Sequence, residues 1–244
     1  MPETVLGIMH IHTDYSYDGR DSLQEVARLA KRKGYGFLLL TEHNDDFSDE
    51  KMQRFVAECE RLSTNDLIIV PGLEVNCDFG RHLLAIGIKK YIGIADPDKV
   101  IDKIKENGGL AILPHPGLYQ FRSFLTSASN LDGVEVWNSR YDSKYAPNPK
   151  SFSLLKNLRK ENPGIFAYGG QDLHSVRELD DLSLRVELAR PSEFEILHRL
   201  EKGRFEVARK RMAIDSVGDI TKTQKVLFDI VASADILGKT LWNS

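Results

Sequence analysis

The chain has 244 residues, of which 41% are hydrophobic and 28% are charged, and its formal net charge is -3. This length suits a single large α/β domain with a full core, and no apolar run approaches the roughly 20 residues that a membrane span needs. The charge argues against broad nucleic-acid binding through the phosphate backbone, although a local site could still bind a small phosphorylated substrate.

The N-terminus and the two cysteines bear on the compartment. MPETVLGIMH has no basic segment followed by a long apolar stretch, so we expect a cytoplasmic protein rather than a secreted one. Cys59 and Cys77 are too few and too isolated for a disulfide framework or a cysteine-based zinc site. We therefore expect both cysteines to be buried apolar residues.

Short apolar runs alternate with amphipathic stretches along the chain. The apolar runs predict buried strands at 5–12, 37–43, 66–74, 82–88, 110–115, 133–138 and 165–174. Helical spacing and helix-end signals predict helices at 21–34, 48–62, 96–109, 149–164, 191–203 and 221–237. The first helix, for example, opens at the N-cap candidates Asp21 and Ser22 and closes on Gly34.

The alternation of strand and helix is typical of an α/β protein with parallel strands and outer helices. At least six such units favour a closed or nearly closed (β/α) barrel, with an open, doubly wound sheet as the alternative. The first strand leads into HIHTDYSYDG rather than a glycine-rich turn, which disfavours a Rossmann fold that binds a nucleotide cofactor.

The domain organisation is expected to be simple. The chain has no Pro-, Gly- and Ser-rich linker and no repeat, so we expect one domain over 1–244, with about 205–244 as a C-terminal extension that ends in a helix. The polar, proline-interrupted stretch 138–150 predicts a long loop. Such loops at strand ends often shape a substrate pocket.

The histidines are concentrated at the predicted strands. Six of the seven lie at or beside an apolar run, and only His198 lies in a helical stretch, where we expect an ordinary packed or surface residue. Three carboxylates share these positions. The carboxyl ends of all barrel strands open on one face, so these side chains are expected to converge on one site. The nine are His10, His12, Asp18, His43, Glu74, His82, His115, Asp172 and His174.

This residue set points to metal chemistry. Imidazole and carboxylate without thiolate form the ligand set of catalytic zinc, manganese or iron. His10 and His12 project to the same side of a strand, and although such a pair alone is as often structural as functional, the histidines at later strand ends favour a shared site. Nine ligands exceed the needs of one ion, which predicts two or three divalent ions.

The chain also resembles a known family. Its ordered motifs, over roughly residues 5 to 190, are similar to those of the PHP (polymerase and histidinol phosphatase) phosphoesterase family: HIHTDYSYDG, TEHND, PGLEVN, RHLLAIG, LPHPG, GVEVWN and GGQDLH. Each motif alone is weakly specific, whereas the ordered set is highly specific. The resemblance implies a distorted (β/α)7 barrel.

The resemblance also implies how the nine side chains divide among three ions. The first ion would be held by His10, His12, Glu74 and Asp172, and Glu74 would bridge to the second. His82 and His115 would complete the second site, and the third would use Asp18, His43 and His174. TEHN at 41–44 departs from the commoner TDHD, but Glu42 and Asn44 are not expected ligands, so the departure concerns the tuning of the site.

The predicted function is a metal-dependent phosphoesterase that hydrolyses a phosphate ester through a metal-activated water. Asp172, His43 and His174 are the expected catalytic residues, the two histidines as candidate proton donors. The expected substrate is a small phosphorylated molecule or a nucleotide. Nucleic acid is less favoured, no membrane partner is expected, and the sequence does not fix the oligomeric state.

Three alternatives remain open at this point. The chain could be a nucleotide phosphatase or an exonuclease that acts on nucleic-acid ends. It could be a non-catalytic metal-binding regulatory module, although the full ligand set and the lack of a polymerase domain weigh against this. A metal-dependent amidohydrolase would share the barrel and the histidines, but such enzymes usually carry a carbamylated lysine, and no lysine lies at a matching strand end.

Substrate-binding residues are predicted from their places beside the motifs. Arginines suit phosphate because their guanidinium groups form paired hydrogen bonds with it, although most exposed arginines are only solvated surface groups. The candidates are Arg140, at the start of the long loop, then Arg177, Arg20 and Arg81, and also Asn138. Trp137 and Tyr141 could stack on a base or sugar, although core packing explains Trp137 equally well.

Overall fold

The computed structural model describes residues 2–120, 122, 125 and 128–242. All six predicted helices are confirmed: α1 (Leu23–Arg32), α2 (Asp49–Leu62), α3 (Pro97–Glu106), α4 (Pro149–Leu158), α5 (Glu193–Glu201) and α6 (Lys222–Trp242). The first five begin at a Ser, Asp or Asn whose side chain accepts a hydrogen bond from an N–H of the first turn. Three short 3-10 helices are η1 (Asn44–Asp46), η2 (Pro116–Tyr119) and η3 (Val176–Glu178).

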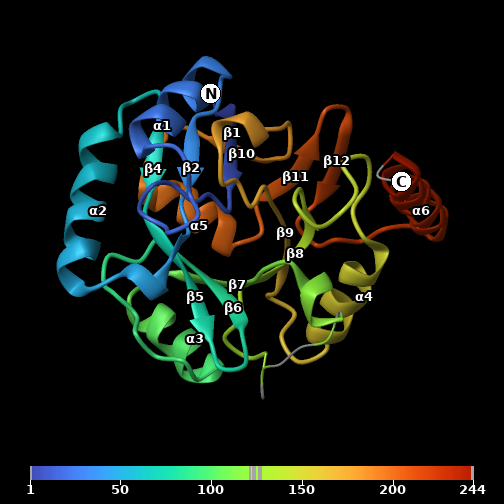
Figure 1. Ribbon diagram of the computed structural model, residues 1–244. Helices are drawn as coiled ribbons and strands as arrows, with labels where there is room; N and C mark the ends of the chain where they lie inside the picture. Colours follow the sequence, from blue (N-terminus) through green and yellow to red (C-terminus); the bar gives the residue numbers. More distant parts are fainter. Residues whose placement is uncertain (1, 121, 123–124, 126–127, 243–244) are drawn as a thin grey trace.

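The strands form two six-stranded sheets (Figure 1). The first has the order β12 (Met212–Asp215), β11 (Phe205–Arg209), β10 (Ser183–Leu188), β1 (Glu3–Met9), β2 (Phe37–Leu39) and β4 (Ile68–Val70). The second has the order β3 (Glu42–His43), β5 (Gly72–Cys77), β6 (Arg81–Ile86), β7 (Leu110–Leu113), β8 (Gly133–Asn138) and β9 (Phe166–Gly170). Each of the seven predicted strand runs overlaps at least one of these strands.

The prediction that all strands are parallel is wrong. β5 and β6 are antiparallel because only three residues, Asp78 to Gly80, join them, and a parallel crossover needs a dozen or more. Phe79 and Gly80 turn this hairpin with positive φ angles of 63° and 65°. β6 is also antiparallel to β7, and β10 is antiparallel to both β1 and β11. The fold is therefore α/β with mixed sheets, and closure into a seven-stranded barrel stays a prediction.

The two sheets run into one another. Only Leu40 and Thr41 separate β2 from β3, and a single proline separates β4 from β5. At the other junction, the segment after β1 lies beside the segment after β9, where Ile11 and Leu173 form a parallel bridge and the Leu173 N–H donates to the His10 carbonyl at 3.0 Å. The carboxyl ends of strands from both sheets therefore meet at one face.

The last third of the chain adds strands that the sequence pattern did not predict. Residues 205–215, which were expected in a C-terminal extension, form β11 and β12, and β11 pairs with β10 in the first sheet. α6 follows and packs on α4 through Phe228, whose ring lies 6.4 Å from that of Phe152. That these elements form a single domain with the rest stays a prediction, and residues 1, 243 and 244 of the expected range lie outside the described chain.

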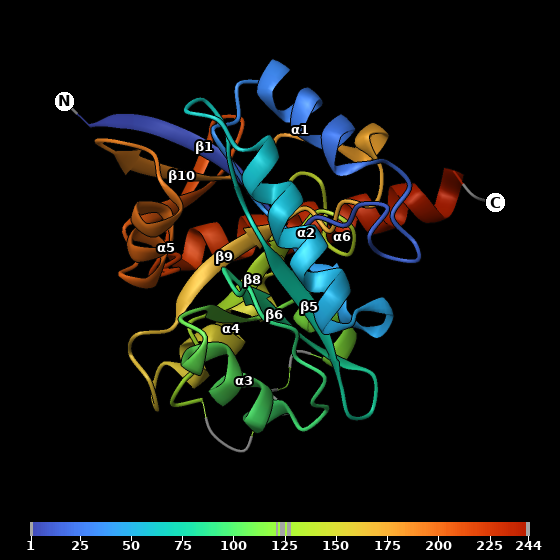
Figure 2. The ribbon, with the colours of Figure 1, turned by 90° about the vertical axis from the view of Figure 1, so that its left-hand side faces the viewer.

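The helices surround the strands and leave one end open. α1, α2, α3 and α4 lie around the strands, whereas α5 lies at the end where β1 begins (Figures 1 and 2). Within the described residues, no helix is both long and apolar enough to cross a membrane. The opposite end, where β1 finishes, carries the polar side chains discussed next.

Candidate metal centre

The structure brings all nine predicted side chains together at the end where β1 finishes. His10 and His12 directly follow β1, His43 ends β3, Glu74 lies in β5, and His115 follows β7. Asp172 and His174 follow β9, and Asp18 lies in the loop between β1 and α1. His82 lies at the start of β6 and still reaches this face, because that strand runs antiparallel to its neighbours and pairs His82 with Asn76.

The Glu74 carboxylate is the centre of the cluster. Its Oε1 atom lies 2.7 Å from His82 Nδ1 and 2.9 Å from His115 Nε2. Its Oε2 atom lies 3.4 Å from His10 Nε2, from His12 Nε2 and from His43 Nδ1. One carboxylate oxygen thus faces two histidines and the other faces three, which is the arrangement expected of a carboxylate shared between two ions.

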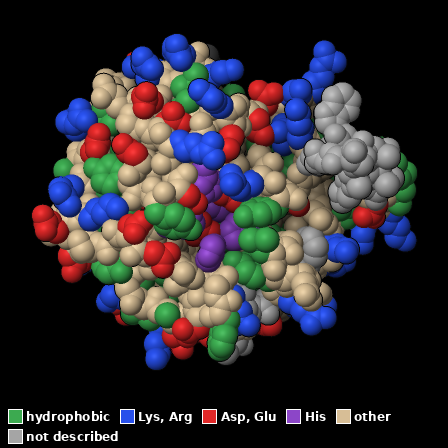
Figure 3. Space-filling view, viewed as in Figure 1, with side chains coloured by type: hydrophobic (Ala, Val, Ile, Leu, Met, Phe, Trp, Pro, Cys, Tyr) green, Lys and Arg blue, Asp and Glu red, His purple; other side chains and the backbone are tan. Residues whose placement is uncertain are grey.

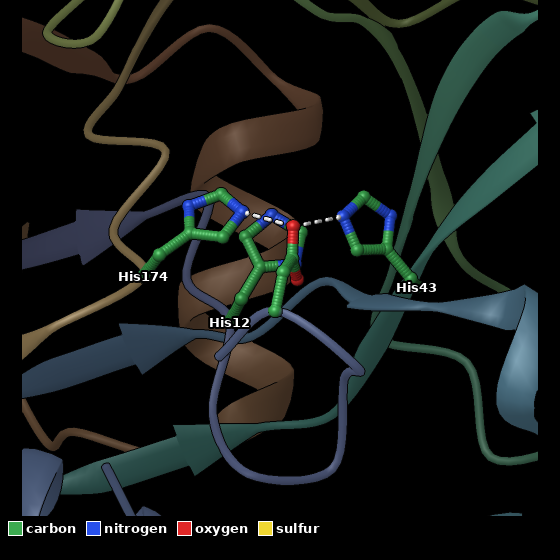
Figure 4. A group of neighbouring side chains, drawn as sticks. His12, His43 and His174 are labelled. Carbon is green, nitrogen blue, oxygen red and sulfur yellow. Dashed lines mark ion pairs between the residues drawn. The ribbon is translucent and has the colours of Figure 1, made fainter. Parts of the chain in front are cut away.

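A second group lies around Asp18. Its Oδ2 atom is 2.9 Å from His174 Nε2 and 3.4 Å from His43 Nε2. Figure 4 shows His43 and His174 on either side of this carboxylate, with His12 behind it, and the dashed lines are these two ion pairs. The rings of His43 and His174 both stack on that of His12, with centroids 4.4 and 4.3 Å away.

Asp172 connects the two groups. Its Oδ1 atom lies 3.7 Å from the Nε2 atoms of both His10 and His12 and 3.4 Å from His174 Nδ1. The His174 ring is fixed in addition by its Nδ1 atom, which is 2.9 Å from the Asp172 carbonyl oxygen. The two ring nitrogens of His174 therefore face different aspartates, Nδ1 facing Asp172 and Nε2 facing Asp18.

The backbone is strained where three of these residues leave their strands. His10, His115 and Asp172 have positive φ angles of 65°, 29° and 53°. Residues with a Cβ rarely adopt this region, at a cost of roughly 1–3 kcal/mol each, and such residues cluster at functional sites. At each of these positions the backbone leaves its strand path, and all three side chains belong to the cluster.

Glu135, in β8, is a buried carboxylate that the sequence reasoning missed. Its Oε1 atom lies 2.8 Å from His10 Nδ1, and its Oε2 atom accepts hydrogen bonds from the His115 N–H at 2.8 Å and from Asn138 Nδ2 at 2.9 Å. Gly170 makes room for it, since a Cβ on that glycine would lie 1.9 Å from Oε1. A buried carboxylate in the GVEVWN strand was the available signal, because burial of such a group demands partners.

Electrostatics favour the protonation states that metals require. Burial by itself raises the pKa of Glu74, but His10 and hydrogen bonds from three histidines hold it well below its usual value. Burial holds the pKa of His12 well below its ordinary range. Glu74 opposes this shift, and the charge of His10 adds to it. Glu74 is therefore ionised and His12 neutral, which are the forms that bind cations.

His10 has the opposite shift. Burial alone lowers its pKa, but Asp172, then Glu135 and Glu74, together raise it well above the usual value. The proton on His10 therefore balances part of the negative charge of the surrounding carboxylates. Bound cations would supply the same charge and displace that proton.

The residues fit divalent metal ions. Among the described residues, His12 Nε2 and Asp18 Oδ1 are buried polar atoms with no hydrogen-bond partner, and both belong to the cluster. Four overlapping groups each gather their ligand atoms within 4.8 Å of one another: His12, Asp18, His43 and His174; His10, His115 and Asp172; His10, His12 and Glu74; Glu74, His82 and His115. Nitrogen and oxygen donors of this kind could hold zinc, manganese or iron.

The predicted substrate-binding residues differ in where their side chains lie. Arg140 reaches the cluster, with Nη1 at 3.3 Å from His174 Nδ1 and 3.6 Å from Glu178 Oε2. Asn138 is buried and its side chain is engaged with Glu135 and with the backbone N–H groups of Arg140 and Tyr141. It therefore braces the start of the loop.

Arg20 and Arg177 are both exposed. Their backbone N–H groups contact His174 and Ser175. Arg81 lies over the Phe79 ring at 5.4 Å.

Aromatic residues border the cluster. The Tyr17 ring is 70% exposed and stacks on His43 at 5.1 Å, and the half-exposed Tyr141 ring meets the edge of His115 at 5.4 Å. Figure 3 shows histidines at the bottom of a hollow, with hydrophobic side chains on both sides and basic ones above. Trp137, by contrast, is buried and donates to the Ser143 carbonyl, so it is a core residue. His198 lies on α5, at the other end of the strands.

Known proteins resemble this chain in sequence and fold. An uncharacterized protein of Methanocaldococcus jannaschii is 31% identical over 170 residues, which cover 62% of this chain and 91% of that protein. A "Probable histidinol-phosphatase" of Thermotoga maritima is 23% identical over 202 residues, or 73% of this chain and 79% of that one.

A solved structure shares the fold. It is a two-domain protein of Bacteroides vulgatus that contains a predicted PHP-like metal-dependent phosphoesterase. The two chains superpose with a TM-score of 0.62 at 18% identity, over 87% of this chain and 67% of that one.

The family model named PHP domain matches residues 9–157. This match spans more than half of the chain and includes six of the seven motifs on which the resemblance was based, so the resemblance is confirmed. The chain belongs to the PHP domain family.

Proposed function

We propose that this protein is a metal-dependent phosphoesterase that hydrolyses a phosphate ester at the nine-residue cluster around Glu74. One observation carries the proposal: a buried, ionised carboxylate has five histidine nitrogens within 3.4 Å, divided between its two oxygens. A structural core has no need for such a concentration of titratable groups. Membership of the PHP domain family supports the same function.

The proposed cofactor is two or three divalent ions of zinc, manganese or iron. Glu74, His82 and His115 would hold one ion, and His10, His12, Glu74 and Asp172 another. Asp18, His43 and His174, with His12 nearby, would hold the third. When bound, such ions lower the pKa of a water molecule and neutralise charge on phosphoryl oxygens.

The protein's own residues would orient the substrate and handle protons. Arg140, beside His174 and 42% exposed, is placed to direct its guanidinium at a phosphate that enters the hollow. His174 has its Nδ1 atom bound to the Asp172 carbonyl. Both histidines have a carboxylate oxygen within 3.4 Å of each ring nitrogen, so both are candidates to hold a proton for the leaving group.

The proposed substrate class is a small phosphorylated molecule or a nucleotide. Tyr17 and Tyr141 offer exposed rings next to His43 and His115, and therefore flank the two sides of Glu74. Aromatic faces of this kind suit a planar or sugar-like leaving group. The rival function is an exonuclease, and the two are separated by supplying phosphate monoesters, phosphate diesters and short single-stranded oligonucleotides to the same protein.

The first prediction tests the reaction. Metal-stripped protein supplied with zinc, manganese or iron should hydrolyse at least one phosphate monoester or diester, and Glu74→Gln should lower turnover by about 100-fold or more because it removes the charge shared between ions. Glu187→Gln, the same change on the exposed face of β10, is the matched control. Near-normal turnover by metal-saturated Glu74→Gln protein would remove the basis for the proposal.

A second prediction concerns Glu135. Glu135→Gln should weaken metal binding by roughly 10- to 100-fold. Whichever way the new amide turns, its NH2 group faces a hydrogen-bond donor, either the His10 ring or the donors on His115 and Asn138, and so it no longer holds both histidines in place. Competition with a chelator measures the affinity, circular dichroism checks the fold, and Glu187→Gln again serves as the control. Unchanged affinity would show that Glu135 only fills space.

The third prediction concerns Arg140. Arg140→Ala should lower kcat/KM by roughly 10- to 100-fold, since a charge-assisted hydrogen bond to an anion contributes about 1.5–3 kcal/mol. Metal content should not change, and Arg140→Lys should rescue only partly because lysine lacks the paired donors. Arg185→Ala, on β10 and paired with Glu206, is the control. Unaltered kinetics would transfer the role to Arg20, Arg81 or Arg177.

A further inference from the structure

The loop that carries Asp18 is held in a compact shape by its own backbone. Within this loop, residues 13–19, the Ser16 N–H donates to the Thr13 carbonyl at 2.9 Å and the Gly19 N–H donates to the Ser16 carbonyl at 3.3 Å. Gly19 passes so close to Thr13 that a Cβ would lie 1.9 Å from the Thr13 carbonyl oxygen. These contacts fix the shape of the loop but do not by themselves fix its position against the other ligands.

The position of the loop is fixed by one buried carboxylate in a neighbouring strand. Glu42, in β3, is fully buried, and its oxygens accept hydrogen bonds from the Thr13 N–H at 3.0 and 3.1 Å and from the Thr13 hydroxyl at 2.6 Å. The Ser16 hydroxyl also donates to Glu42, at 2.5 Å, and accepts from the His43 N–H at 2.9 Å. Glu42 thus ties both the start and the middle of the loop to the strand that ends in His43.

We infer that Glu42 is the positioning residue that holds Asp18 against His43 and His174, and so completes the third metal position. The inference rests on the proposed function, because it assigns Glu42 to one of the proposed metal positions. Glu42 touches none of the nine side chains by a hydrogen bond of its own. It acts through Ser16 and Thr13 on Asp18, which lies within the loop between β1 and α1.

The length of Glu42 and its two acceptor oxygens both suit it to this task. These oxygens are shared by three donor groups, all of which need an acceptor, so a carboxylate satisfies them and an amide cannot. In Glu42→Gln, the Thr13 N–H would face the new NH2 group whichever way the amide turns, since it now contacts both oxygens. Glu42→Asp keeps both oxygens but is one methylene shorter, so it cannot span Thr13 and Ser16 together.

The metal position proposed at Glu74, His82 and His115 is independent of this tie. These three residues lie on or directly beside strands, and Glu135 contacts His115. The position that uses His12 is not independent, because Ser16 Oγ lies 3.5 Å from His12 Nδ1. Loss of Glu42 should therefore weaken the Asp18 position most and leave the position of Glu74, His82 and His115 unchanged. A residue that served only folding would act on all three or on none.

The test measures metal binding and not activity. Wild-type protein, Glu42→Gln and Glu42→Asp are titrated with manganese or zinc against a chelator, and the stoichiometry and each affinity are recorded. We expect the position that Asp18→Asn also weakens to lose roughly 10- to 100-fold in affinity in Glu42→Gln, with the position of Glu74, His82 and His115 unchanged. Glu58→Gln is the matched control, because Glu58 also binds this loop, through the Tyr15 hydroxyl at 2.7 Å, but does not contact Thr13 or Ser16.

The outcomes separate this inference from the proposed function. Three unchanged affinities in folded Glu42→Gln and Glu42→Asp would overturn the role of Glu42 alone, whereas a wild type that binds no metal would overturn the proposed function. Equal weakening at every position would also overturn the inference. If both Glu42 variants fail to fold, Ser16→Ala removes the hydrogen bond between Ser16 and Glu42 and should show the same selective loss of affinity. A Ser16→Ala protein without that loss would contradict the inference.

Discussion

The site depends on the burial of the Glu74 carboxylate. Charged groups are costly to bury unless they are paired, and Glu74 is only 2% exposed. The histidines that surround it compensate this cost, and their arrangement around both oxygens suits the proposed bridging position between two cations. Nearby carboxylates, Asp172 first, raise the pKa of His10 well above its usual value, whereas burial dominates at His12 and lowers its pKa.

Much of the fold was predictable because its signals are local. Helix ends were marked by capping residues such as Ser22 and Ser48, and six helices followed from them. Strand direction was not predictable in the same way, since it depends on which strands pair. The hairpin at Phe79 and Gly80 reverses β6, and this reversal is what brings His82 to the site from the start of a strand. β10 to β12 lie outside the continuous apolar runs from which the strands were predicted. β10, SLRVEL, instead alternates apolar and charged residues, which is the pattern of a strand with one exposed face.

The nine residues of the cluster could be named from the sequence because histidine and carboxylate at strand ends are conspicuous. The residues that position them could not. Glu135 and Glu42 are distant in sequence from most of the groups they contact, and each resembles an ordinary strand glutamate until its burial is known. The roles of all nine as ligands, and of Arg140 toward substrate, remain predictions. Backbone strain at His10, His115 and Asp172 was also invisible, because positive φ angles at residues with a Cβ arise from tertiary contacts.

The central claim is that Glu74 lies between two metal ions, and one measurement addresses it directly. Crystals grown with manganese or zinc and measured at the absorption edge of that metal should show two or three anomalous peaks within the cluster. The account predicts that a peak lies within about 2.5 Å of each Glu74 oxygen, a distance typical of bound cations. A single peak, or none, in fully loaded crystals would contradict it.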